Sequence, residues 1–140
     1  MKAIKSGTYT SPFTNKEVRV ILCAESLWMT QLQMSELFGC DVREVHIVLK
    51  ALFASEELDR SIVNRAIEIE NYEGNYVSGN FYNLDAITAV GYRLNPKETT
   101  HFHIWSSQVL RHYIFTLQNR HNYGIIESIK RKVSHMLAVA

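Results

Sequence analysis

The stretch from Trp28 to Leu52 constrains the fold more than any other part of the chain, because its apolar spacing predicts two helices joined by a tight turn. The first helix is expected over residues 29–38, with apolar positions at Leu32, Met34, Leu37 and Phe38. Gly39 follows, and glycine enters the left-handed conformation that ends a helix without steric cost. Asp41 then offers a side-chain acceptor to the free amides of a second helix.

The second helix places a stripe of apolar residues on one face, and we expect this stripe to be buried. Its members are Val42, Val45, Val48, Leu49 and Leu52. The small Ser35, the turn glycine and the β-branched Val45 and Val48 have the spacing of a helix-turn-helix. Two interpretations stay open at this point: a DNA-binding helix-turn-helix, and a pair of amphipathic helices without a DNA function.

A β-hairpin is predicted after these helices, over residues 65–82. Ile67 and Ile69 alternate with Glu68 and Glu70, and Glu73-Gly74-Asn75 supplies the turn. A further strand is expected over residues 18–24. A hairpin after a helix-turn-helix is the plan of a winged helix. The three glutamates of this wing face solvent in the prediction and oppose phosphate binding, which favours a structural hairpin or a partner other than DNA.

Two or three helices are expected in the C-terminal part. Asn83 caps a helix over residues 84–94, which Asn95-Pro96 ends, and Thr99 or Thr100 caps a longer helix that runs to about residue 122. Residues 123–140 form a last amphipathic segment with a basic face. We expect its apolar stripe to be buried, either against this domain or against a second copy of the chain.

A chain of 140 residues is long enough for one domain with a hydrophobic core. We predict a single α+β domain over residues 1–140, with a small antiparallel sheet. It divides into a winged-helix-like part (18–82), a helical part (83–122) and a C-terminal amphipathic helix (123–140). The formal net charge is only +1, but residues 101–140 carry five basic residues against one acidic residue.

The location and chemistry of the protein are predicted largely from what the sequence lacks. Cys23 and Cys40 have no disulfide or zinc spacing, no signal peptide is evident, and no apolar run is long enough for a membrane span, so we predict a cytoplasmic protein. No HExxH, CxxC, glycine-rich phosphate loop or catalytic triad context occurs. We therefore expect no enzymatic activity, no metal, no cofactor and no small-molecule substrate.

Three blocks of the sequence carry a family resemblance. They are WMTQ at 28–31 with MSELFG at 34–39, FYNLDAITAVGYRLN at 81–95, and a third block with Phe102, Ile104-Trp105, Val109-Leu110 and Tyr113. Together they resemble RhuM-type proteins over roughly residues 18–114. These are bacterial proteins named for virulence-associated loci, and DNA binding is proposed for them. The resemblance implies a winged-helix-like N-terminal region and a prokaryotic or phage-related context, and it implies no established reaction.

The leading functional prediction is binding of double-stranded DNA, with the second helix in the major groove. The residues predicted to contact DNA are Arg43, His46, Ile47 and Lys50 on that helix, Thr30 and Gln31 at the start of the first helix, and Arg93 and Lys97. A homodimer is expected, because one such helix reads few base pairs. Asp41 and Glu44, also turned outward, weaken the expected electrostatic attraction to DNA.

Two alternatives use the same features differently. In the first, the protein is an interaction module that keeps the winged-helix shape and does not bind DNA. In the second, it binds single strands by stacking bases on Tyr72 and Tyr76, although this would need basic neighbours that the wing lacks.

Overall fold

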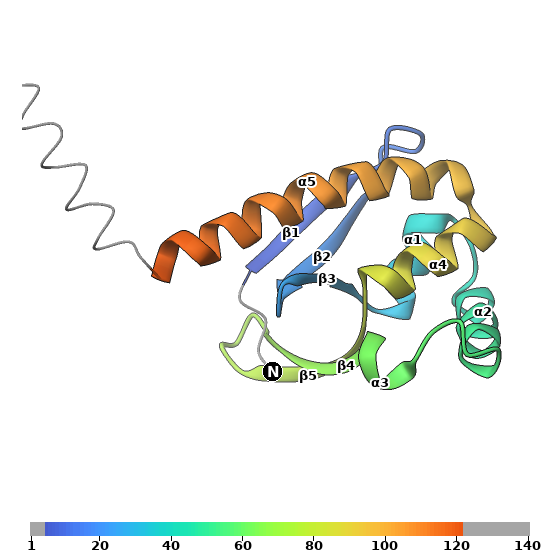
Figure 1. Cartoon of the computed structure of the whole chain (residues 1–140), viewed down its shortest axis with the longest axis horizontal. Helices are drawn as coiled ribbons and strands as arrows, with labels where there is room; N and C mark the ends of the chain where they lie inside the picture. The colour runs from blue at the N-terminus through green and yellow to red at the C-terminus, as the bar shows by residue number, and fades with distance from the viewer. Residues whose placement is uncertain (1–4, 122–140) are drawn as a thin grey trace, which may run out of the picture.

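The computed structural model describes residues 5–121, with side chains up to residue 118. The elements follow in the order β1 (Lys5–Thr10), β2 (Glu17–Cys23), β3 (Ser26–Met29), α1 (Gln31–Phe38), α2 (Val42–Ala54), α3 (Arg60–Val63), β4 (Asn64–Glu70), β5 (Tyr76–Asn83), α4 (Leu84–Leu94) and α5 (Pro96–His121). Figure 1 shows their arrangement. The predicted α+β class is confirmed. The amphipathic segment predicted over 123–140 lies outside the described residues.

The strands form one five-stranded antiparallel sheet in the order β1-β2-β3-β5-β4. The predicted hairpin is confirmed as β4 and β5, and the predicted strand over 18–24 is β2. Strand β3 pairs with β5 through Trp28 opposite Asn83 and Met29 opposite Tyr82. The hairpin therefore joins the sheet through β3, the strand that directly precedes α1, and it does not pair with β1 or β2.

The two faces of the sheet carry separate apolar clusters, because successive side chains of a strand point to opposite faces. On one face, the first three strands share a core with α1, α2, α4 and α5. Tyr9 of β1 packs edge-on against Phe102 and Trp105 of α5, which lies alongside β1 (Figure 1). On the other face, Trp28 belongs to a smaller cluster and donates an indole hydrogen bond to the carbonyl of Cys23.

The predicted pair of helices joined by a tight turn is present as α1 and α2. Gly39 ends α1 in the left-handed conformation (φ 70°), and Asp41 caps α2 as expected. Both helices begin with a capping box, in which the cap side chain and the third helical residue satisfy each other's backbone amides. Ser35 is buried, and its hydroxyl donates to the carbonyl of Leu32 at 2.6 Å.

Some predicted details of this helix pair are wrong. The first helix begins at Gln31 and not at residue 29, because Met29 is the last residue of β3 and Thr30 is the cap. Two predicted core positions face solvent: Leu32 is 60% exposed and Val42 is 38% exposed. Both residues lie in the first turn of their helix.

The start of α5 also differs from the prediction. The helix begins at Pro96, with Asn95 accepting the amide of Glu98 through its side chain at 3.2 Å. Proline suits the first helical position because its missing N–H would have no partner there. Thr99 and Thr100 are therefore inside the helix and do not cap it. Thr99 is fully buried, and its hydroxyl donates to the carbonyl of Asn95.

At Gly91, helix α4 packs tightly against α1 and α5. A Cβ at this position would overlap Thr99 Oγ1 of α5 and would lie 2.7 Å from the ring of Phe38 of α1. Only a residue without a side chain lets α1, α4 and α5 meet at this distance. The glycine of the VGYR block thus has a packing role.

Candidate nucleic-acid interface

Helix α2 has one buried face and one face that is exposed to solvent. The side chains of Val45, Leu49 and Leu52 are buried, whereas those predicted to contact DNA are exposed: Arg43, His46, Ile47 and Lys50. The buried face packs against α1 and α4, and α2 lies at the edge of the molecule, away from the C-terminal half of α5 (Figure 1). In the described structure the exposed face is thus accessible along the length of the helix.

The acidic residues at the start of α2 are occupied by capping. The Asp41 carboxylate accepts the Arg43 amide at 2.8 Å, and the Glu44 carboxylate accepts the Asp41 amide at 3.1 Å. The Arg43 side chain also binds Asp41, with 3.2 Å between Nη2 and Oδ2. Hydrogen bonds from the Arg43 side chain and then from its amide lower the pKa of Asp41. Because the pair is exposed, it is weak, and Arg43 can exchange Asp41 for another anion.

The polar groups of Thr30 and Gln31 are used inside the protein. The Thr30 amide donates to the Gln33 side chain at 2.9 Å, and the Thr30 hydroxyl accepts the Gln33 amide at 3.1 Å. Gln31 donates its side-chain amide to the hydroxyl of Tyr82 on β5 at 3.1 Å. Thr30 therefore caps α1, and the Gln31 side chain connects the start of this helix to β5.

Arg93 and Lys97 also have partners within the chain. Arg93 donates from Nη2 to both carboxylate oxygens of Glu57, at 2.8 and 2.7 Å. The Lys97 ammonium lies 4.4 Å from the ring centroid of Phe13, in the connection between β1 and β2. The predicted site thus separates into four exposed side chains on α2, of which Arg43 is paired with Asp41, and four residues whose polar groups have partners in other parts of the fold or in their own helix cap.

The β4–β5 hairpin ends in an acidic and aromatic tip. Tyr72 is fully exposed, Tyr76 and Val77 are about half exposed, and Glu70 and Glu73 face solvent. Glu68, by contrast, is partly buried, so the sequence-based expectation that all three glutamates face solvent holds for only two of them.

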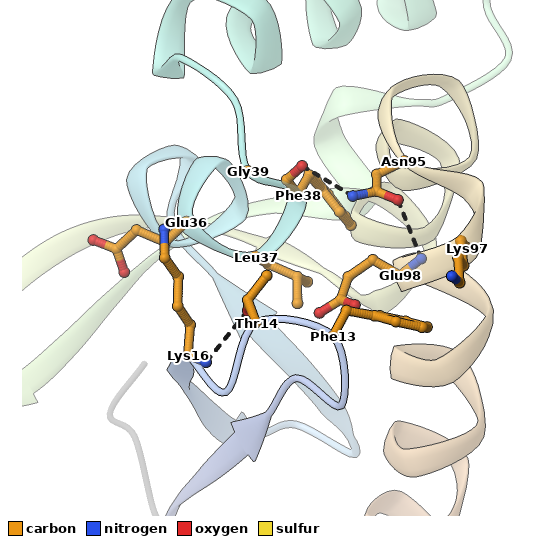
Figure 2. Close-up of a pocket in the computed structure, with 10 residues that line it drawn as sticks. All are labelled: Phe13, Thr14, Lys16, Glu36, Leu37, Phe38, Gly39, Asn95, Lys97 and Glu98. Atoms are coloured by element: carbon orange, nitrogen blue, oxygen red, sulfur yellow. Dashed lines mark hydrogen bonds between the residues drawn. The ribbon is translucent and has the colours of Figure 1, made fainter.

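A pocket that the sequence reasoning missed lies between the β1–β2 connection, the end of α1 and the start of α5 (Figure 2). Its volume is about 200 Å³. The Glu98 side chain points into it, although this residue is only 3% exposed. The spacing could have revealed this burial, because Glu98 precedes the buried Phe102 by four residues and so shares its helix face.

The comparisons with known proteins concern mainly the second half of the chain. Residues 62–121 match the model of the Virulence protein RhuM family, which confirms the predicted resemblance for this part. The match includes the block at 81–95 and the third block, whereas the block at 28–39 lies outside it. Searches of curated proteins and of solved structures gave no match.

Two features are absent from the described residues, a membrane-spanning helix and a cluster of metal-ligating side chains. Between residues 5 and 121, no helix combines the length and apolar character that a membrane span requires. Between residues 5 and 118, where side chains are described, no three histidine, cysteine, aspartate or glutamate side chains come together as a candidate metal site.

Proposed function

We propose that this protein binds double-stranded DNA without catalysing a reaction, and that α2 enters the major groove. The observation that carries the proposal is the exposure of Arg43, Ile47 and Lys50 along one face of α2, opposite its buried stripe. Arginine and lysine donate to guanine or phosphate, and an apolar side chain contacts the thymine methyl group. His46, on the same face, adds a further polar contact.

The order of the elements around α2 supports this proposal. Strand β3, helices α1 and α2, the short helix α3 and the β4–β5 hairpin follow one another in the chain, and β3 pairs with the second strand of the hairpin. This order agrees with a winged-helix interpretation of residues 26–83. The capping roles of Asp41 and Glu44 also support it, because they give these carboxylates a structural reason to be present on a DNA-binding helix.

The hairpin has a different role in this proposal from that of a phosphate-binding wing. Its tip carries Glu70 and Glu73, and carboxylates near phosphates oppose binding. The DNA contacts are therefore assigned to α2 alone. Since a single helix reads few base pairs, we propose that the protein binds as a homodimer.

A salt titration of binding to random-sequence duplex DNA tests the proposal. Arg43→Ala with Lys50→Ala should weaken binding and flatten its salt dependence, because each lost phosphate contact lowers the slope of log K against log salt by about 0.9. The matched control is Arg19→Ala with Arg111→Ala, which removes the same charge from β2 and α5. An identical titration for both double variants would contradict the assignment of α2 as the DNA-binding helix.

The hairpin tip favours a second candidate function, a protein-interaction module that does not bind DNA. Exposed tyrosines beside carboxylates suit a basic protein surface better than a phosphate backbone. The two candidates differ in a simple measurement. Absence of duplex binding by the wild-type protein at low salt would reject DNA binding and leave the interaction module.

A further inference from the structure

One face of the β4–β5 hairpin is largely exposed to solvent. Ile67 and Ile69 of β4 pack in the smaller apolar cluster on the other face of the sheet. Glu68 and Glu70 alternate with them and therefore point to the opposite side. Tyr76 is the cross-strand partner of Glu70 and shares this side. We call Glu68, Glu70 and Tyr76 the acidic face of the hairpin; Glu70 is exposed and Tyr76 is 50% exposed.

The turn of the hairpin extends the acidic face. It contains Glu73, which is exposed, and Tyr72, which is fully exposed. Between residues 66 and 83 the sequence has three glutamates and no lysine, arginine or histidine. Among residues 5–118, none of these glutamates forms an ion pair. Exposed aromatic rings beside unpaired carboxylates suit a partner that is both apolar and basic.

The last part of the sequence has this composition. Residues 123–140 lie outside the described residues, and their sequence predicts an amphipathic helix. Its three basic residues follow one another as Lys130, Arg131 and Lys132, and Glu127 is its one acidic residue. Its apolar positions are Ile125, Ile126, Ile129, Val133, Met136 and Leu137.

Helix α5 brings the chain to the correct side of the sheet. The side chains of Phe102 and Tyr113 on α5 pack in the larger core, which lies on the same side of the sheet as the acidic face. The end of α5 and the turn of the hairpin both lie toward one end of the long axis of the molecule, opposite to α2 (Figure 1). Nine residues separate His121 from Lys130, and they span roughly 30 Å when extended. Gly124 offers a position at which a helix can end and the chain can turn back.

We propose that residues 123–140 fold back onto the acidic face of the hairpin in the same chain. The basic residues of the segment face Glu70 and Glu73, and its apolar stripe covers Tyr72 and Tyr76. A segment of the same chain competes well against that of a second copy, because a short connection gives a high effective concentration. The contact is separate from the exposed face of α2 and does not depend on DNA binding.

Hydrogen–deuterium exchange of the full chain, measured by mass spectrometry in peptides from 123–140, tests this contact. Glu70→Lys with Glu73→Lys turns attraction into repulsion and should speed the exchange of these peptides about fivefold. Lys130→Glu with Arg131→Glu should do the same, after correction for the intrinsic rates of the altered peptides. Combining the four substitutions restores opposite charges and should return the exchange towards the wild-type rate.

The matched control is Glu17→Lys with Glu36→Lys, which reverses two exposed charges on β2 and α1 and should leave the exchange as in wild type. Equal exchange in the wild type and in both hairpin and segment variants would overturn the proposal. Failure of the fourfold variant to recover would also overturn it. Sedimentation equilibrium decides between one chain and two: a wild-type dimer that either reversal converts to a monomer would place the segment on the hairpin of a second copy instead.

Discussion

The Arg93 guanidinium binds the carboxylate of Glu57 through Nη2, at 2.7 Å from one oxygen and 2.8 Å from the other. The contact joins α4 to the segment that follows α2, across 36 positions of sequence. It has two consequences: it fixes the end of α2 relative to α4, and it neutralises a cation that would otherwise be available to a phosphate. Both consequences can be measured.

Removing the Glu57 charge should strengthen DNA binding, if the protein binds DNA as proposed. Glu57→Gln releases Arg93 and removes a carboxylate next to α2, so we expect tighter binding at low salt and a steeper salt dependence. The free energy of unfolding should change by less than about 1 kcal/mol, because both partners are substantially exposed. Urea denaturation and a salt titration measure the two effects. A large loss of stability with unchanged DNA affinity would show that this ion pair is mainly structural.

Filling the space at Gly91 should destabilise the fold. In Gly91→Ala, the new methyl group meets Thr99 and the Phe38 ring, and we expect a loss of about 1–3 kcal/mol in the free energy of unfolding. Gly7→Ala is the control, since its Cβ would lie at an ordinary 3.6 Å from Val20. Urea denaturation of both variants measures the difference. An equal loss in the free energy of unfolding for both would contradict the prediction.

The cap of α2 should make stability depend on pH in the acidic range. Hydrogen bonds from the Arg43 side chain and then from its amide lower the pKa of Asp41 in the folded protein. A lowered folded-state pKa gives a contribution that is present above the usual aspartate pKa and is lost as the pH falls through the folded-state value.

Asp41→Asn tests this contribution. The difference in free energy of unfolding between wild type and this variant should be fully present at pH 7 and should shrink towards pH 3. Urea denaturation at the two pH values measures it. An equal difference at both would mean that the charge of Asp41 is unimportant for the cap.

The environment of Tyr9 should be visible in an alkaline titration. Burial, and secondly the charge of Glu98, raise the pKa of Tyr9 to about 12. A spectrophotometric titration of wild type minus Tyr9→Phe should show one phenol that ionises well above the ordinary value of 10.0. Because the folded-state pKa is raised, the associated stability is present below pH 10 and is lost as the pH rises through the folded-state value.

Glu98→Gln provides the internal check on the alkaline titration. It removes the negative charge, so the pKa of Tyr9 should fall towards the value that burial alone produces. If the difference titration shows that the Tyr9 phenol ionises near pH 10 in the folded protein, this result would contradict the described packing of Tyr9 against Phe102 and Trp105.

Local sequence signals predicted the elements whose residues interact with near neighbours. Gly39, Asp41 and Asn83 mark helix ends correctly, since a cap is made by residues within three or four positions. Strands β1 and β3 were missed. In β1 only Tyr9 is buried, and β3 has four residues, so neither shows a recognisable alternation.

By itself the sequence determined the pair α1–α2 and the outward face of α2, because the helical period decides which side chains share a face. Only the tertiary structure decided that Arg93 meets Glu57 and that Glu98 lies close to Tyr9. These partners are far apart in the chain, and they meet because helices α4 and α5 pack against α1 and the sheet at distances set by Gly91 and the surrounding core. No local pattern encodes that choice of partners.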